Sequence, residues 1–171
     1  MRKKDNMAVA FEAVAAASPN FVRFRGLPVA RELAAKESLP LFLCFKEKKI
    51  DKGTVMYMAQ DNSEGIMYLI LEGSVSVSDS PRHIYSILGA GDVFGLFSFL
   101  DQERLHSASI QARSNLTVLS LKREYFDAIT IEDPMLGNQL LRFMFRLLSR
   151  MTLKLEVEYS ALRETHSEDC S

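Results

Sequence analysis

The chain has 171 residues, of which 47% are hydrophobic and 25% are charged, a composition typical of one soluble globular domain and not of a disordered chain. Its net charge is −1, from 21 basic and 22 acidic side chains, whereas a dedicated nucleic-acid binder usually carries a basic excess. The composition therefore disfavours direct binding of DNA or RNA.

The N-terminal segment, residues 1–20, begins with basic residues and continues into Ala, Val and Phe, which imitates a signal peptide. Asp5 and Glu12 interrupt that pattern, and no apolar run approaches the ~20 residues that cross a bilayer. The two cysteines, Cys44 and Cys170, lie far apart and form no disulfide framework. We therefore expect a cytoplasmic protein that does not enter a membrane.

The first third of the chain favours helices. Residues 1–28 start Ala-rich and predict a flexible or helical N-terminal extension. Residues 29–39, VARELAAKESL, consist of good helix formers and predict a short helix that Pro40 ends. We expect the folded domain to cover residues 29–163.

From residue 41 to 121, short runs of β-branched and aromatic residues alternate with turns of Gly, Asp, Asn and Ser. Their spacing of about 8–12 residues predicts an antiparallel barrel or sandwich. In ILEGSV (70–75), Gly73 is expected at positive φ in a tight hairpin. In SVSVS (74–78), serines alternate with valines, which predicts one wet and one buried face.

A helical pattern takes over at residue 122 and strengthens at Asp133, an N-cap acceptor followed by proline at the first helical position. The pattern continues to about Arg163, so we expect one long helix over 134–163 and a polar tail over 164–171.

A heptad-spaced apolar seam runs along this predicted helix, with leucines every seven residues and methionines three residues after the first two. Its members are Leu141, Met144, Leu148, Met151, Leu155 and Leu162. Leu140, Phe143 and Leu147 widen the apolar stripe toward the barrel. Two apolar faces predict a parallel homodimer through this helix, and the alternative is a helix wholly covered by its own barrel.

Several short motifs follow one another in a fixed order: KG at 52–53, YLILEGSV at 68–75, GAGDVFG at 89–95 and SAS at 107–109. This order resembles the cyclic-nucleotide-binding domain of the catabolite-activator (CRP-FNR) type, over roughly residues 39–160. The resemblance implies a mainly β fold with flanking helices, namely a double-stranded β-helix (jelly-roll) barrel plus a long C-terminal dimer helix.

In that family a phosphate-binding cassette reads Gly-Glu, then nine residues, then Arg followed by Ser or Thr and Ala. Backbone amides and the arginine hold the cyclic phosphate, and the glutamate accepts the ribose hydroxyl. Here Gly95 matches the glycine and Ser107-Ala108 match the small pair, but Leu96 and His106 replace the two charged residues. The resemblance therefore implies weak binding of cAMP or cGMP.

The resemblance also implies a set of ligand-binding positions. They are Phe94, Gly95, Leu96, Phe97, Arg104, His106, Ser107 and Ala108. His106 could partly replace the arginine when protonated, and Arg104 could reach a phosphate from two positions earlier. By spacing, Met151 and Thr152 fall where the family meets the base, although Met151 also suits a dimer core.

Catalytic and metal-binding patterns are absent from the sequence. It holds no His-x-His spacing of a cupin metal site, no G-x-S-x-G and no P-loop, so we expect no catalytic residue, no metal, no cofactor and no enzyme. The chain also ends soon after the long helix, which leaves no room for the helix-turn-helix of related transcription factors.

We therefore expect a stand-alone regulatory module that senses another small ligand or binds a protein partner. Two alternatives stay open. One is a signalling protein that does bind cAMP or cGMP, and the other is the sensor half of a transcription regulator whose partner binds DNA.

Overall fold

The computed structural model describes residues 12–80, 83–101 and 103–168, with side chains of the last helix described as far as residue 157. Its helices are α2 (Pro19–Gly26), α3 (Pro28–Arg31), α4 (Ala35–Leu43), α5 (Leu96–Leu100), α6 (Arg123–Glu132) and α7 (Pro134–Glu168). Its strands are β1 (Lys46–Ile50), β2 (Val55–Tyr57), β3 (Ile66–Glu72), β4 (Val75–Ser80), β5 (His83–Leu88), β6 (Val93–Phe94), β7 (Ser109–Ala112) and β8 (Leu116–Lys122).

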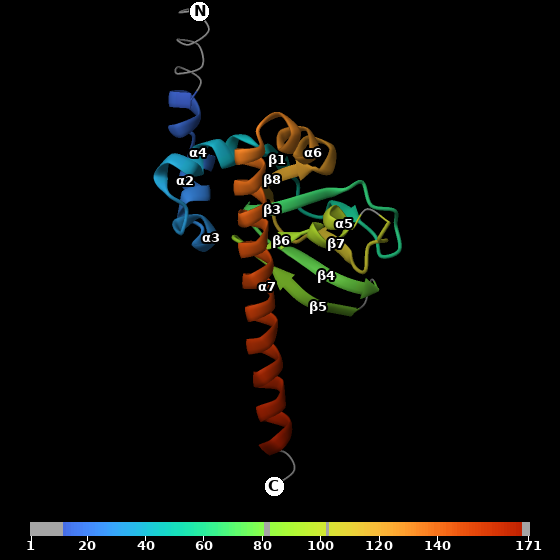
Figure 1. The fold of residues 1–171 in the computed structure, drawn as a ribbon. Coiled ribbons are helices and arrows are strands. Elements are labelled where there is room, and N and C mark those ends of the chain that lie inside the picture. The colour runs from blue at the N-terminus through green and yellow to red at the C-terminus, as the bar shows by residue number, and fades with distance from the viewer. Residues whose placement is uncertain (1–11, 81–82, 102, 169–171) are drawn as a thin grey trace, which may run out of the picture.

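The strands form two four-stranded antiparallel sheets, one in the order β1-β8-β3-β6 and the other in the order β2-β7-β4-β5. Residues of both sheets share one apolar core, and Figure 1 shows α2–α4 and α7 on one side of the strands. This arrangement confirms the predicted jelly-roll barrel with flanking helices. Gly73 joins β3 to β4 at φ 91°, as the hairpin motif predicted.

Strand β3 explains how both cores form. Its residues alternate between two apolar environments because successive side chains of a strand point to opposite faces. Met67 and Leu69 face the helices, whereas Tyr68 and Ile70 face the second sheet. The unbroken apolar run at 66–71 is therefore the sequence signature of a strand buried on both faces.

An aromatic cluster ties the N-terminal helices to α7. Phe24 of α2 lies between Phe42 of α4 and Phe143 of α7, with ring centroids 5.6 and 5.8 Å away. Phe24 is fully buried, so the folded unit begins before residue 29. Of the predicted N-terminal extension, residues 12–16 and α2 are helical, and residues 1–11 lie outside the described part.

The prediction of one helix over 29–39 was wrong. The chain forms α3 and α4 with a break at 32–34, and Pro40 lies inside α4 instead of ending it. Proline has no backbone N–H, so Pro40 cannot donate the usual helical hydrogen bond. Because α4 ends at Leu43, within one turn of Pro40, the helix loses little by lacking that one bond. The Cys44 thiol donates a hydrogen bond to the Pro40 carbonyl oxygen at the C-terminal end of α4.

Two further expectations need correction. Ser76 of β4 is buried, not wet, and its hydroxyl donates to the Gln111 carbonyl of the neighbouring strand, which satisfies its polar group within the sheet. Helix α7 continues through residues 164–168, which the sequence predicted as a tail. Its start is as predicted, since the Asp133 side chain accepts a hydrogen bond from the Leu136 amide.

Helix α7 is 35 residues long, which corresponds to roughly 50 Å. Its N-terminal half lies between helices α2–α4 and the barrel, and its C-terminal end projects beyond the strands (Figure 1). Among the described residues, no helix combines the length and the apolar character needed to span a membrane.

Candidate functional site

A cavity of about 280 Å³ opens where the cassette segment (residues 94–108), strands β4 and β5, and helix α7 meet. Most of the predicted ligand-binding residues line it. Those that do are Phe94, Gly95, Phe97, Arg104, His106, Ser107, Ala108 and Met151. The remaining two predicted positions, Leu96 and Thr152, are not part of the lining.

Gly95 sets the backbone of the cassette segment. It lies at φ 73°, in the left-handed region, immediately before α5. A Cβ at this position would lie 2.4 Å from the carbonyl oxygen of Ile66 in β3. Only glycine allows both the φ value and the close approach of the two backbones, so the turn into α5 depends on it.

The sequence prediction for Leu96 was wrong. Its side chain is 1% exposed and packs in the core beneath the helix layer with Leu27 and Phe99. The first position of α5 therefore points its side chain away from the cavity. An apolar residue there stabilises the core and contributes no group to a ligand.

His106 does line the cavity, but it is buried and already engaged. Its ring stacks on Tyr57 with centroids 3.6 Å apart and an interplanar angle of 9°. Its Nδ1 lies 3.4 Å from the Ser98 hydroxyl. Burial lowers the pKa of His106, while the carboxylates of Asp61 and Glu64 oppose that shift. His106 is therefore neutral at pH 7 and supplies no positive charge.

Tyr57 is a site residue that the sequence did not reveal. Its ring stacks on His106, with centroids 3.6 Å apart, and burial raises the pKa of its hydroxyl, while the nearby Gly95 backbone opposes that shift. No sequence signal marks Tyr57, because an aromatic residue in a predicted strand is ordinary.

The family model described as the cyclic nucleotide-binding domain matches residues 47–133, which is half of the chain. The chain belongs to the cyclic nucleotide-binding domain family. The match contains the two sheets and the cassette segment, and so most of the lining of the cavity of this cyclic nucleotide-binding domain. No curated protein sequence gives a significant match.

Solved structures agree with the family. A cyclic nucleotide-binding domain from Methylobacillus flagellatus KT is 23% identical, with a TM-score of 0.69 over 85% of this chain and 83% of that one. The catabolite activator protein of Thermus thermophilus is 25% identical, with a TM-score of 0.56 over 77% and 63%. The regulatory domain of Toxoplasma gondii PKA, solved with cAMP, is 25% identical, with a TM-score of 0.51 over 64% and 42%.

Arg104 carries the positive charge of the cavity in this cyclic nucleotide-binding domain. Its guanidinium carbon lies 6.0 Å from the centroid of the Phe97 ring, a distance at which the ring face attracts a cation. Among the described residues, Arg104 forms no ion pair and no Asp or Glu lines the cavity. The domain therefore presents one uncompensated cation to a ligand.

Helix α7 closes one side of the cavity. Met151 and Leu155 line it, whereas the Thr152 hydroxyl donates to the Leu148 carbonyl of its own helix, 3.1 Å away. The prediction that Thr152 meets a base is not supported by this position. An ion pair between Lys154 and Asp92, 3.1 Å long, attaches the helix to the loop that precedes β6.

The predicted dimer seam needs a partial correction. Met144 is only 2% exposed because it packs in the domain's own core, and Met151 packs against the same core. Leu148 is half-buried against that core too. Of the predicted positions, Leu141 and Leu155 are exposed, although Leu155 also lines the cavity, and the exposed row gains Phe145, which is 68% exposed. Leu141, Phe145 and Leu148 are separated by four and then three residues, a heptad spacing that was visible in the sequence. The side chain of Leu162 lies outside the described part.

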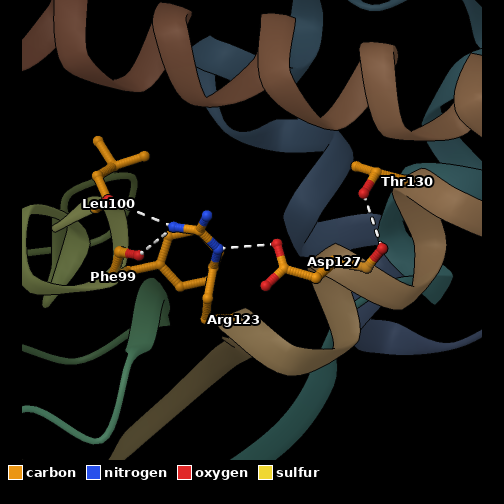
Figure 2. Close-up of polar contacts among 5 residues, drawn as sticks. All are labelled: Phe99, Leu100, Arg123, Asp127 and Thr130. Atoms are coloured by element: carbon orange, nitrogen blue, oxygen red, sulfur yellow. Dashed lines mark hydrogen bonds and ion pairs between the residues drawn. The ribbon is translucent and has the colours of Figure 1, made fainter. Parts of the chain in front are cut away.

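Arg123 connects the cassette segment to the C-terminal helices, as Figure 2 shows. Its Nη1 donates to the carbonyl oxygens of Phe99 and Leu100, 3.2 and 3.3 Å away, at the end of α5. Its Nε donates to Asp127 of the same helix at 2.9 Å. The guanidinium thereby satisfies carbonyls that a helix end leaves without a partner, and α5 is attached to α6.

The contact between α6 and α7 continues this connection. A Cβ on Gly137 of α7 would lie 2.7 Å from Thr130 Cγ2 of α6, so the two helices touch through that glycine. Because α7 also lines the cavity through Met151, a continuous set of packed elements leads from α5 through α6 to the opposite wall.

The other chemistry-bearing side chains offer little. Burial raises the pKa of the Cys44 thiol to about 11, so the reactive thiolate is scarce at pH 7. Within the described ranges, no group of three or more His, Cys, Asp or Glu residues is placed to hold a metal ion.

Proposed function

We propose that this domain is a regulatory sensor module whose cavity holds a small ligand other than a cyclic nucleotide. The observation that supports it is the lining of the cavity. Arg104 is its one charged residue among the described ones, His106 is neutral, and no carboxylate is available for a ribose hydroxyl.

The energetic argument follows from the two altered cassette positions. Hydrogen bonds to charged groups contribute about 1.5–3 kcal/mol each. The loss of two such bonds weakens binding of a cyclic nucleotide by about 10²–10⁴-fold.

Calorimetry with cAMP and cGMP tests the proposal. We expect no saturable binding at micromolar ligand, and a dissociation constant in the low micromolar range would overturn it. His106→Arg is the informative variant, because it restores a guanidinium at a position that lines the cavity, although it removes the stacking on Tyr57. Leu96→Glu is not suitable, since it would place a carboxylate in the buried position of Leu96.

We also propose that the module acts as a homodimer through α7. The support is the row of outward apolar side chains, Leu141, Phe145 and Leu155, on a helix that already covers its own core with another face. A heptad-spaced apolar row is the pattern by which one helix packs on a second copy. The dimer would place two cavities on either side of the paired helices.

A binding role, not catalysis, fits the cavity best. The contact between Ser98 and His106 resembles a nucleophile beside a base, but the Ser98 hydroxyl donates to the Gly95 carbonyl at 3.2 Å. The hydroxyl hydrogen is therefore directed away from the imidazole.

We place the module in a reducing cytoplasm, for which the free thiol of Cys44 is the support.

A further inference from the structure

Most of the wall of the cavity is apolar. Residues from both sheets and from α7 contribute to it. They include Val77, Leu88, Leu105, Ile110, Met151 and Leu155. The polar side chains that line it, apart from Arg104, are His106 and the hydroxyl-bearing Tyr57, Tyr85, Ser86, Ser98 and Ser107. His106 is stacked on Tyr57, and the Ser98 hydroxyl donates to the Gly95 carbonyl, so few of them are free to pair with the many polar groups of a sugar or a nucleobase. The body of a ligand that fits this wall is a hydrocarbon.

The shape of the space favours a chain over a compact ring. A second groove of about 520 Å³ lies along α7 and shares Val93 and Met151 with the cavity. Leu147, Leu153, Val157 and Pro28 form the apolar part of this groove, whose lining also includes Arg150 and the ion pair of Lys154 with Asp92. The two spaces are neighbours on either side of Val93 and Met151, so a ligand longer than the cavity would extend past those side chains toward the groove.

Arg104 fixes the polar end of the ligand. The guanidinium is held over Phe97 at the cavity and has no acidic partner among the described residues. Arginine binds a planar carboxylate with two parallel hydrogen bonds. The neighbouring Ser107 also lines the cavity and offers a hydroxyl to the same head group.

We propose that the ligand is a straight-chain monocarboxylate, with its carboxylate on Arg104 and its hydrocarbon chain along Met151 toward the groove beside α7. This inference rests on the proposed sensor function, because it names the ligand class of the same cavity.

The test is calorimetry of the intact domain with hexanoate, octanoate, decanoate and dodecanoate, each below its micelle concentration. Each added pair of methylene groups should tighten binding roughly tenfold, since it buries more apolar surface. Arg104→Gln should weaken binding of decanoate roughly tenfold or more, and binding of decanol should not change. Arg113→Gln is the matched control, because Arg113 is exposed and lies outside the cavity lining.

The outcomes separate this inference from the proposed function. If neither the carboxylates nor the cyclic nucleotides bind, the ligand class is wrong and the sensor proposal is untouched. If Arg104→Gln and Arg113→Gln bind decanoate equally, the head group is not at Arg104 and the inference is overturned. Low-micromolar binding of cAMP would overturn both proposals together.

Discussion

Gly95 is a single residue on which the shape of the cavity depends. Gly95→Ala places a methyl group 2.4 Å from the Ile66 carbonyl oxygen and leaves an L-residue at φ 73°. We expect it to lower the free energy of unfolding by at least about 2 kcal/mol, measured by urea denaturation. Gly89→Ala is the control, because nothing lies within 4 Å of its Cβ and its effect should stay within about 0.5 kcal/mol.

His106 makes stability depend on pH. Burial lowers its pKa in the folded state, so the unfolded chain binds the proton more readily. The stabilisation is complete above the unfolded pKa of about 6.5 and is lost as the pH falls through that value toward the lower folded one. Wild type should therefore lose more unfolding free energy than His106→Gln between about pH 7 and pH 5.

Urea denaturation of both proteins across that range measures this difference, and titration of the His106 ring by NMR measures the pKa directly. Parallel stability curves for the two proteins would contradict the prediction. Asp61 and Glu64 are the charges that oppose the shift, so their removal should lower the pKa of His106 further.

At the residue scale, the sequence predicted the positions of the site better than their orientations. Gly95, Arg104 and His106 line the cavity as expected, because local motif order fixes where the cassette backbone runs. Leu96 was misassigned because a motif gives the position of a side chain but not which side of the short helix α5 it occupies. Tyr57 comes from a strand distant in sequence, and only the folded barrel brings it to His106.

Among the elements, α5 and α6 are connected through Arg123. Arg123→Met removes the donors to the carbonyls of Phe99 and Leu100. We expect it to lower the free energy of unfolding by about 1–2 kcal/mol and to speed hydrogen exchange in α5. Asp127→Asn alters only a half-exposed ion pair, so its cost should stay below about 1 kcal/mol. Equal effects of the two variants would show that the carbonyl contacts contribute little.

The helices illustrate which elements a sequence can define. The N-cap at Asp133 was correct because a side-chain acceptor and a following proline act locally. The break between α3 and α4 was missed because burial in the shared core fixes Val29, Ala30 and Leu41. The residues of the segment alone do not reveal that packing, because it depends on partners elsewhere in the chain. Tertiary packing also tolerates Pro40 inside α4.

For the molecule as a whole, the exposed row on α7 predicts assembly. Phe145→Glu places a charge at the most exposed aromatic position of that row, and we expect it to convert a dimer into a monomer in sedimentation equilibrium. Ile131→Glu is the control, since Ile131 is exposed on a different helix, α6. An unchanged mass for Phe145→Glu would contradict dimerisation through this face.

The global fold was predictable because several short signals agree. The turn glycines, the doubly buried strand at 66–71 and the helix start at Asp133 each favour the same barrel followed by a helix. The boundary at residue 29 was not predictable, because Phe24 is recruited into the core by aromatic partners distant in sequence.

The stacking of Tyr57 on His106 has a practical consequence. The chain contains no tryptophan and five tyrosines, and two of them, Tyr57 and Tyr85, line the cavity. Its ultraviolet emission therefore comes from phenol rings, one of which lies 3.6 Å from an imidazole. A guest that separates those two rings changes the intrinsic fluorescence, so the unlabelled protein is its own optical probe for screening compounds.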